Sequence, residues 1–320
     1  MPVTITAGIT FSGGGLTMAF APPSEATAGW WAGGGTPSVS SYVQRVTFAT
    51  DTATASIRGP LTVARLSAGA VSTFTYGWVA SGYFPSTSTV ERITFASDTG
   101  TTSTRGPVVA RNALSGAGND TYGWFGGWDN PSPAQSTVDR IDYANDTATA
   151  SIRGPLSGAR RYMGSTGNSN YGWWAGGTPN SVTALASMDR IDYANDTATA
   201  SVRGNLSIVR FGLTASTDGT TYGWFAGGVG SSPSYPDRSS IDRMTYANDT
   251  ATATARGPLV VATFKLAGTG SNTYGYYGGG GPGPFSNVQR ITYATDTDIA
   301  STRGPLAAAA YNQAASAGIQ

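Results

Sequence analysis

Apolar and polar residues alternate along short stretches of the chain, most clearly in residues 136–144, STVDRIDYA. Every second residue from Val138 onward would face the same side of an extended strand, so this stretch predicts a β-strand. An aromatic stretch ending in Gly-Gly, residues 122–127, precedes it, and TATASIRG, residues 147–154, follows it after an Asn-Asp turn signal. A stretch of small residues, 162–168, completes a predicted unit of four strands.

This unit recurs six times. The spacing between its first arginines is 47, 48, 50, 53 and 47 residues, and they are Arg45, Arg92, Arg140, Arg190, Arg243 and Arg290. A second arginine follows each by 13 residues, in an Arg-Gly pair: Arg58, Arg105, Arg153, Arg203, Arg256 and Arg303. An aspartate follows each first arginine by six residues: Asp51, Asp98, Asp146, Asp196, Asp249 and Asp296. Four strands per unit of this length predict a six-bladed β-propeller.

The first and last repeat units predict how the ring closes. The last unit stops where an aromatic strand would begin, whereas the first unit begins with its aromatic strand, residues 29–34. The C-terminal stretch from about Tyr311 to Ile319 is therefore expected to supply the inner strand of the first blade, which removes an exposed sheet edge. Glycine, serine and alanine suit the inner strands, which crowd around the channel.

Composition narrows the class of protein. The 320 residues include 44 glycines, 11% aromatic and only 12% charged residues, which fits many short strands with a core between them. A net charge of +1 without a basic run argues against nucleic acid as a partner. No apolar run is long enough to cross a membrane, and the N-terminus has no basic segment typical of a signal peptide.

The order of these features resembles the kelch repeat, which runs from a small-residue strand through an aromatic strand, a variable loop and an aromatic-Asp turn to a strand before Pro. The stretches YGWFAGG, IDRMTYAND and ATATARGPL stand in that order within residues 222–259. The kelch arginine after the proline is present four times: Arg65, Arg111, Arg160 and Arg210. Thr263 and Ala310 replace it in the last two units, and the usual outer-strand Trp is absent. The resemblance covers residues 28–320 and implies a divergent kelch-like propeller, all-β, with four antiparallel strands per blade.

The repeated sequence motif DTATASxRGPL is similar to repeats in structural proteins of marine and cyanobacterial phages. This resemblance implies a virion protein, made in the host cytoplasm, that is a tail fibre or another host-attachment component binding a host surface glycan or protein. Two alternatives stay open, a purely structural capsid-decoration or tail component and a cellular kelch-type protein-interaction module.

Catalysis and cofactors are not expected. The chain contains no His and no Cys, which removes His-dependent acid–base catalysis, thiolate chemistry and the usual transition-metal ligands. Some kelch propellers are copper oxidases, but their ligand chemistry has no counterpart here. The repeated Asp residues are expected to form Asx-type turns, with a rim calcium as the alternative. We therefore expect a non-enzymatic protein with no cofactor and no metal.

The variable loops after each Gly-Gly are the expected recognition surface, because variable loops on a rigid scaffold commonly carry binding. They should leave the same face as the Arg-Gly-Pro-Leu turns, opposite the Asn-Asp turns. The candidate partner-binding residues are the aromatic and charged residues of these loops that fall outside the consensus: Tyr83, Phe84, Trp128, Asp129, Asn130, Tyr235, Asp237, Arg238 and Phe285. Trp128 is expected to lie outside the aromatic strands. Packing of these loops onto the propeller is the alternative role.

Residues 1–27 precede the first unit and form a predicted N-terminal arm. Residues 3–11 and 15–23 each read as a short strand around a Gly-rich turn, with Val3, Ile5 and Ile9 as apolar anchors. A strand without a place in its own sheet can add to the edge of another, so the arm is expected to attach the protein to other virion proteins or to its own copies. Pairing with the outer edge of its own propeller is the alternative.

Overall fold

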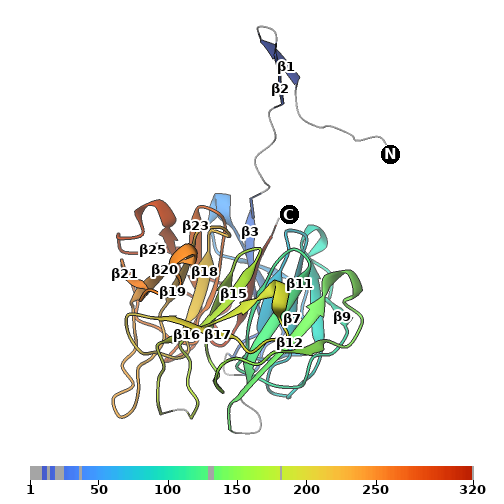
Figure 1. Cartoon of the computed structure of the whole chain (residues 1–320). Coiled ribbons are helices and arrows are strands. Elements are labelled where there is room, and N and C mark those ends of the chain that lie inside the picture. The colour runs from blue at the N-terminus through green and yellow to red at the C-terminus, as the bar shows by residue number, and fades with distance from the viewer. Residues whose placement is uncertain are drawn as a thin grey trace.

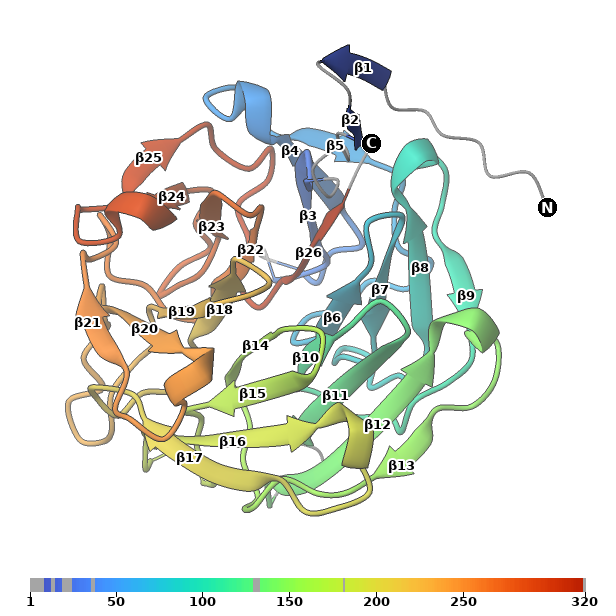
Figure 2. The same ribbon diagram turned by 45° about the horizontal axis from the view of Figure 1, so that its top comes forward.

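The computed structural model of the chain describes residues 9–12, 15–18, 25–35, 38–128, 133–180 and 182–318. Its main body is a ring of six four-stranded antiparallel sheets around a central channel (Figures 1 and 2). Helical structure in these ranges is limited to short 3-10 turns. The predicted all-β six-bladed propeller is confirmed.

Each blade runs from an inner strand at the channel to an outer strand at the rim. Blade 1 contains β26 (Ala314–Gly318), β3 (Ala28–Ala32), β4 (Val43–Thr47) and β5 (Ser56–Arg58), and blade 2 contains β6 (Gly69–Ser72), β7 (Tyr76–Ala80), β8 (Val90–Thr94) and β9 (Ser103–Arg105). Blade 3 contains β10 (Ser115–Gly118), β11 (Tyr122–Trp128), β12 (Gln135–Asp142) and β13 (Ser151–Arg153), and blade 4 contains β14 (Gly164–Gly167), β15 (Tyr171–Ala175), β16 (Ser187–Asp192) and β17 (Ser201–Asn205). Blade 5 contains β18 (Thr214–Thr217), β19 (Tyr222–Ala226), β20 (Ile241–Thr245) and β21 (Thr254–Arg256), and blade 6 contains β22 (Ala267–Gly270), β23 (Tyr274–Gly278), β24 (Val288–Thr292) and β25 (Ser301–Arg303).

The last strand of the chain closes the ring as predicted. β26 pairs antiparallel with β3, with Ala314 opposite Ala32 and Gly318 opposite Ala28. The strand is shorter than the predicted stretch because Asn312 has a φ of 54°, which turns the chain just before the strand begins. Blade 1 therefore combines the two ends of the propeller and leaves neither as an open sheet edge.

Both faces of each blade are buried, since each sheet is packed between two neighbours. In β12, Val138 packs in a cluster with Met163 and Trp174 of blade 4, whereas Ile141 packs with Trp78 and neighbouring residues toward blade 2. Alternate residues of the strand therefore pack into two different cores, one on each side of the blade. The alternation does not distinguish a buried face from a solvent-exposed face. Burial of the aromatic side chains between blades contributes a few kcal/mol each, by the usual area relation of about 25 cal/mol per Å².

The inner strands are built of small residues because they approach one another closely. A Cβ atom on Gly116 of β10 would lie 2.5 Å from the carbonyl oxygen of Ala70 on β6 of the neighbouring blade. Glycine is therefore required where these strands meet at the channel.

The outer strands are much shorter than the predicted residues 147–154. β12 ends at Asp142, and the chain continues into a 3-10 turn, η3 (Tyr143–Asn145), before the three-residue strand β13. Ala150 then donates its N–H to the carbonyl oxygen of Pro107 in the preceding blade connection, 2.9 Å away. Residues 147–150 consequently join two blades instead of extending one sheet.

One buried carboxylate joins each pair of neighbouring blades. The aromatic residue at the centre of each second strand donates a hydrogen bond of 2.8–2.9 Å to the repeated aspartate of the next blade. The pairs are Trp30–Asp98, Trp78–Asp146, Trp124–Asp196, Trp173–Asp249, Trp224–Asp296 and Tyr276–Asp51. The last pair connects blade 6 to blade 1, so the ring is closed by this contact as well as by β26.

Both repeated arginines bind the same aspartate. The first arginine places Nη1 2.7–3.1 Å from the carboxylate, and the second places Nε 3.3–3.5 Å from it, in all six interfaces. The glycine of each Arg-Gly pair donates its N–H to the backbone carbonyl of that aspartate; Gly154 does so to Asp196 at 2.8 Å. A Cβ on Gly154 would lie 1.9 Å from the Ala198 carbonyl oxygen, so no other residue fits there.

These contacts correct the Asx-turn interpretation of the aspartates. Their side chains do not bond the local backbone but lie buried between blades, where each accepts from groups of the preceding blade. The adjacent 3-10 turn supplies an aromatic ring, which stacks on the aromatic residue of the preceding blade at 3.8–4.4 Å between ring centroids.

In the N-terminal region, β1 (Ile9–Ser12) and β2 (Gly15–Met18) pair with each other as a two-stranded antiparallel sheet. Residues 3–8 and 19–23 of the two predicted stretches lie outside the described residues. Candidate anchors Val3 and Ile5 lie outside the described residues, and Ile9 is the first residue of β1.

The inter-blade carboxylate predicts a large effect for Asp196→Asn. The substitution leaves Arg140 and Arg153 without their negative partner at a largely buried site, and we expect it to lower the free energy of unfolding by about 3 kcal/mol. Chemical denaturation followed by tryptophan fluorescence measures this.

The matched control is Asp142→Asn in blade 3, the blade that precedes the one carrying Asp196. Asp142 accepts only the N–H of Ala144, an N-cap contact that asparagine also makes, so a change within about 0.5 kcal/mol is expected. Equal effects of the two substitutions would show that the inter-blade carboxylate contributes no more to the free energy of unfolding than Asp142 does.

Candidate functional site

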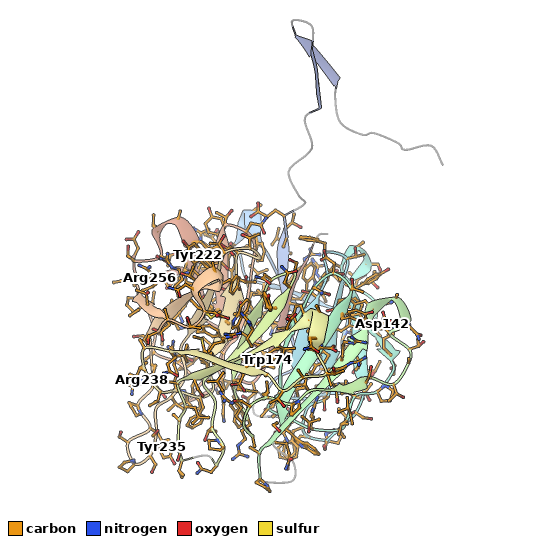
Figure 3. The ribbon with its side chains drawn as sticks, viewed as in Figure 1. Asp142, Trp174, Tyr222, Tyr235, Arg238 and Arg256 are labelled. Atoms are coloured by element: carbon orange, nitrogen blue, oxygen red, sulfur yellow. The ribbon has the colours of Figure 1, made fainter. Side chains whose placement is uncertain are left out.

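The two faces of the ring differ in kind. One face, the turn face, carries the 3-10 turns and the short turns between first and second strands, such as residues 118–122. The opposite face, the loop face, carries the connections between second and third strands and the connections between blades. Figure 3 shows Tyr235 and Arg238 toward the loop face and Tyr222 toward the turn face. The structure thus has the loop arrangement predicted from strand order.

A channel runs between the faces, lined by the six inner strands. Three successive cavities of about 120, 200 and 370 Å³ share lining residues and widen from the loop face to the turn face. Ala26, just before β3, lies at the wide mouth on the turn face. Glu25 also accepts a hydrogen bond from Thr273 Oγ1 at 3.0 Å, so the chain enters the propeller on the turn face.

At the loop face, six residues encircle the narrow channel mouth, one from each blade, and all have φ between 54° and 64°. They are Ser67, Ala113, Tyr162, Gly212, Lys265 and Asn312. Each donates its N–H to the carbonyl oxygen of the equivalent residue in the neighbouring blade at 2.6–3.0 Å, so the six bonds form a closed ring. We call this set the mouth ring. It fixes the backbone of the mouth while leaving its side chains free to differ.

The mouth-ring side chains break the sixfold repeat. The Tyr162 side chain hydrogen-bonds Ser67, two positions along the ring. Burial raises the pKa of Tyr162, which keeps its hydroxyl protonated. Lys265 stands on the other side of Gly212, and burial lowers its pKa because the ammonium group loses contact with water.

The predicted recognition residues fall into separate groups. Tyr83 and Phe84 lie in the blade 2 loop, where their rings meet edge to face at 4.0 Å and Phe84 is 58% exposed. Tyr235, Asp237 and Arg238 lie in the blade 5 loop, three blades away and therefore across the channel mouth. No small ligand could touch both groups.

The blade 4 and blade 5 loops form one raised unit. Ser232 donates its N–H to the Val182 carbonyl at 2.9 Å, and Ala184 donates its N–H to Ser231 Oγ at 2.8 Å. Val182 and Tyr235 are 46% and 39% exposed on this unit. Partial burial raises the pKa of the neighbouring Asp237.

The remaining predicted residues are less exposed or lie outside the described residues. Trp128 is half-buried and is the last residue of β11, which corrects the expectation that it lies outside the aromatic strands. A bulge between Gly126 and Trp128 keeps it in register with β12. Phe285 is half-buried and bridges to the backbone of Ala310. Asp129 and Asn130 lie outside the described residues.

Sequence reasoning missed the mouth ring. The one available signal was that these six residues stand at the same place in each unit yet share no chemistry, and that they include the only lysine of the chain. Nothing in the sequence shows that the six positions meet around one opening, because the residues are about 50 positions apart.

Four buried arginines support the loops from beneath. Arg65 donates to the carbonyl oxygens of Ser81 and Thr89 at 3.0 and 2.8 Å, at the two ends of the blade 2 loop, and forms an ion pair with Glu91. The equivalent pairs are Arg111–Asp139, Arg160–Asp189 and Arg210–Asp242 at 3.0–3.4 Å. These arginines are structural.

Where this arginine is absent, its partner is uncharged. Thr263 and Ala310 replace the arginine, and Gln289 and Gln44 replace the acid in the blades that follow, blades 6 and 1. Gln44 still accepts the N–H of Ala308 and Gln289 that of Val261, the contacts that the carboxylates make elsewhere. Charge is thus removed in pairs, which avoids an uncompensated buried ion.

No group of three or more His, Cys, Asp or Glu residues that could hold a metal ion occurs among the residues whose structure is described. Within the same part of the chain, no helix is long and apolar enough to cross a membrane.

No protein-family model matches the chain, and no curated protein matches it. Among solved structures, the one titled "Structure of YjhT" aligns with 80% of this chain and 88% of its own, with a TM-score of 0.65 and 8% sequence identity. This likeness shows the propeller fold alone. The kelch and phage resemblances therefore rest on the repeated sequences alone.

The pairing of Arg65 with Glu91 predicts strong energetic coupling. Glu91→Gln alone leaves a buried guanidinium unpaired and should cost about 3–5 kcal/mol of stability. Arg65→Ala with Glu91→Gln recreates the Ala310 and Gln44 combination of the ring closure, so the double variant should be more stable than the sum of the single losses by at least about 1 kcal/mol. Denaturation of the four proteins in a double-mutant cycle measures the coupling, and additive losses would contradict it.

Proposed function

We propose that the chain is a non-enzymatic recognition protein whose loop face binds a surface glycan or protein and whose N-terminal arm docks it to a larger particle. The observation that carries this proposal is that the residues between blades are repeated, whereas the residues of the loop face are not. The repeated Asp and Arg residues hold the blades together in every unit, whereas the loop-face residues differ from unit to unit. Glu25 and Ala26, where the described propeller begins, lie on the opposite, turn face.

The loop face has suitable chemistry for an interface. Phe84, Val182 and Tyr235 are large apolar side chains that stand 39–58% exposed on loops whose backbones are held by hydrogen bonds from beneath. Exposed aromatic residues on a rigid support commonly dominate binding energy. Because Phe84 in the blade 2 loop lies across the mouth from the blade 4 and 5 loops, the partner we propose is a macromolecule that covers much of the face.

The particle we propose is a virion, with the protein made in the host cytoplasm and acting in host attachment. This part of the proposal is supported by the likeness of the DTATASxRGPL strings to phage structural repeats.

A purely structural role is the second candidate, and a specific observation favours it. The outer strands expose a rim of apolar side chains, with Ile57, Ile152 and Val202 at 54%, 67% and 61% exposure. Such a rim suits lateral contact with neighbouring subunits in a lattice.

The two candidates predict opposite results for two matched double variants. Tyr235→Asn with Val182→Thr should abolish binding to host cells or to the isolated partner while leaving the melting temperature nearly unchanged. Asn is chosen because Tyr235 has a φ of 41°, which asparagine tolerates. Ile152→Thr with Val202→Thr is the control on the rim and should bind normally. Loss of particle assembly in the rim variant, with normal binding by the loop variant, would favour the structural role instead.

Deletion of residues 1–26 tests the arm. The deletion ends before Thr27, whose carbonyl oxygen accepts the N–H of Phe48, and before β3, so the propeller should fold and melt like the full chain. Incorporation into the particle should be lost, as measured by co-sedimentation. Normal incorporation would place docking on the propeller itself, and failure to fold would place the arm within the ring.

A further inference from the structure

The seam between blades 6 and 1 is held differently from the other interfaces. Its inner strand, β26, pairs with β3, the first strand of the propeller, whereas each other inner strand is joined to its partner by a short turn (Figure 2). On the loop-face side of the seam, Ala310 stands where four other connections carry a supporting arginine. Arg65, for example, reaches the carbonyl oxygens at both ends of the blade 2 loop, and an alanine methyl group cannot make these bonds.

A buried amide further weakens this side of the seam. Gln313 is 7% exposed, and neither its Nε2 nor its Oε1 has a hydrogen-bond partner among the described residues. It lies between the two blades, because a Cβ on Gly279 would be 2.6 Å from its Oε1 and a Cβ on Gly34 would be 2.6 Å from its Cγ. A buried polar group without a partner destabilises the interface that contains it. The equivalent residues of the other five connections are apolar: Ala68, Leu114, Met163, Leu213 and Leu266.

The turn-face side of the same seam keeps its links. Asp51 accepts a hydrogen bond from Tyr276 at 2.9 Å and forms the two ion pairs found in the other interfaces. Gln44 holds the connection as far as Ala308, with one hydrogen bond of 3.1 Å to its carbonyl oxygen and one of 2.7 Å from its N–H. The missing contacts are therefore confined to the residues from Ala310 onward.

These residues complete the mouth ring. Asn312 accepts the N–H of Ser67 at 2.8 Å and donates its own N–H to the Lys265 carbonyl oxygen at 2.8 Å. The next three residues, 313–315, line the narrow cavity of about 120 Å³ at the loop face. Release of this segment therefore breaks two of the six bonds of the ring and widens the narrow end of the channel.

We infer that residues 311–318, the gate segment, detach together from the loop-face side of the seam and open the narrow channel mouth, while Asp51 keeps blades 6 and 1 joined. Proteins open locally where an element has the fewest stabilising contacts, at a free energy below that of global unfolding. The gate segment is such an element, since it lacks the arginine, contains the buried amide and is not tied to its partner strand by a turn.

The test is amide hydrogen exchange of the full chain, resolved to single residues by NMR. The Ser67 amide reports on the gate because it donates to Asn312, and the Tyr162 amide is the matched reference because it makes the same mouth-ring bond to Ala113. The amides of Ser67 and β26 should exchange about tenfold faster than those of Tyr162 and β14, the factor that corresponds to one unsatisfied buried polar group.

Two variants test the cause of the opening. Gln313→Leu supplies the side chain found at the equivalent site between blades 4 and 5, and it should slow exchange at Ser67 and in β26 about tenfold without changing Tyr162. The reverse control, Leu213→Gln, places an amide between blades 4 and 5. It should speed exchange of the Lys265 amide, which donates to Gly212, and leave Ser67 unchanged.

Four results would exclude such a gate. If Ser67 exchanges as slowly as Tyr162, the mouth ring does not open at the seam, and if β26 alone exchanges fast, only the strand end frays. If Gln313→Leu slows Ser67 and Tyr162 equally, the opening is global. If Leu213→Gln leaves Lys265 unchanged, a buried amide does not loosen an interface of this ring. These measurements need no binding partner, so they are independent of the tests of loop-face recognition.

Discussion

A buried carboxylate between neighbouring blades is the contact on which the rest of the propeller depends. Asp196 shows the arrangement: it accepts from Trp124 and pairs with Arg140 and Arg153, all from the preceding blade. An isolated blade would expose apolar residues on both of its faces, so its stability has to come from its neighbours. Because the same contact joins blade 6 to blade 1 through Asp51, every blade is held on both sides.

Because these contacts do not involve the loop residues, the sequences of the loops can vary. The inter-blade carboxylates lie near the turn face, and a second set of ion pairs, such as Arg65 with Glu91, secures the base of the loops. The replacement of both partners by uncharged residues at Ala310 and Gln44 shows that this second set is not indispensable. Loops anchored in this way can differ in sequence without loss of the ring, which is a suitable basis for recognition.

The sixfold repeat is broken at the mouth ring. The mouth ring gives six equivalent backbone positions, yet it carries side chains as different as those of Tyr162, Gly212 and Lys265. The loop face therefore combines a repeated backbone geometry with side chains that differ from blade to blade.

The sequence by itself determined the number of blades, the four-strand unit and the closure by the C-terminal strand, because these follow from local alternation and from spacing that repeats to the residue. It also located the variable loops, since their composition departs from the repeat. It could not show that Asp146 is a link between blades instead of a turn former, because its partners Trp78 and Arg92 are 68 and 54 residues away. The mouth was likewise decided only by the tertiary structure: closing the ring brings together six residues that are far apart along the chain, and their meeting depends on the radius and packing of the blades.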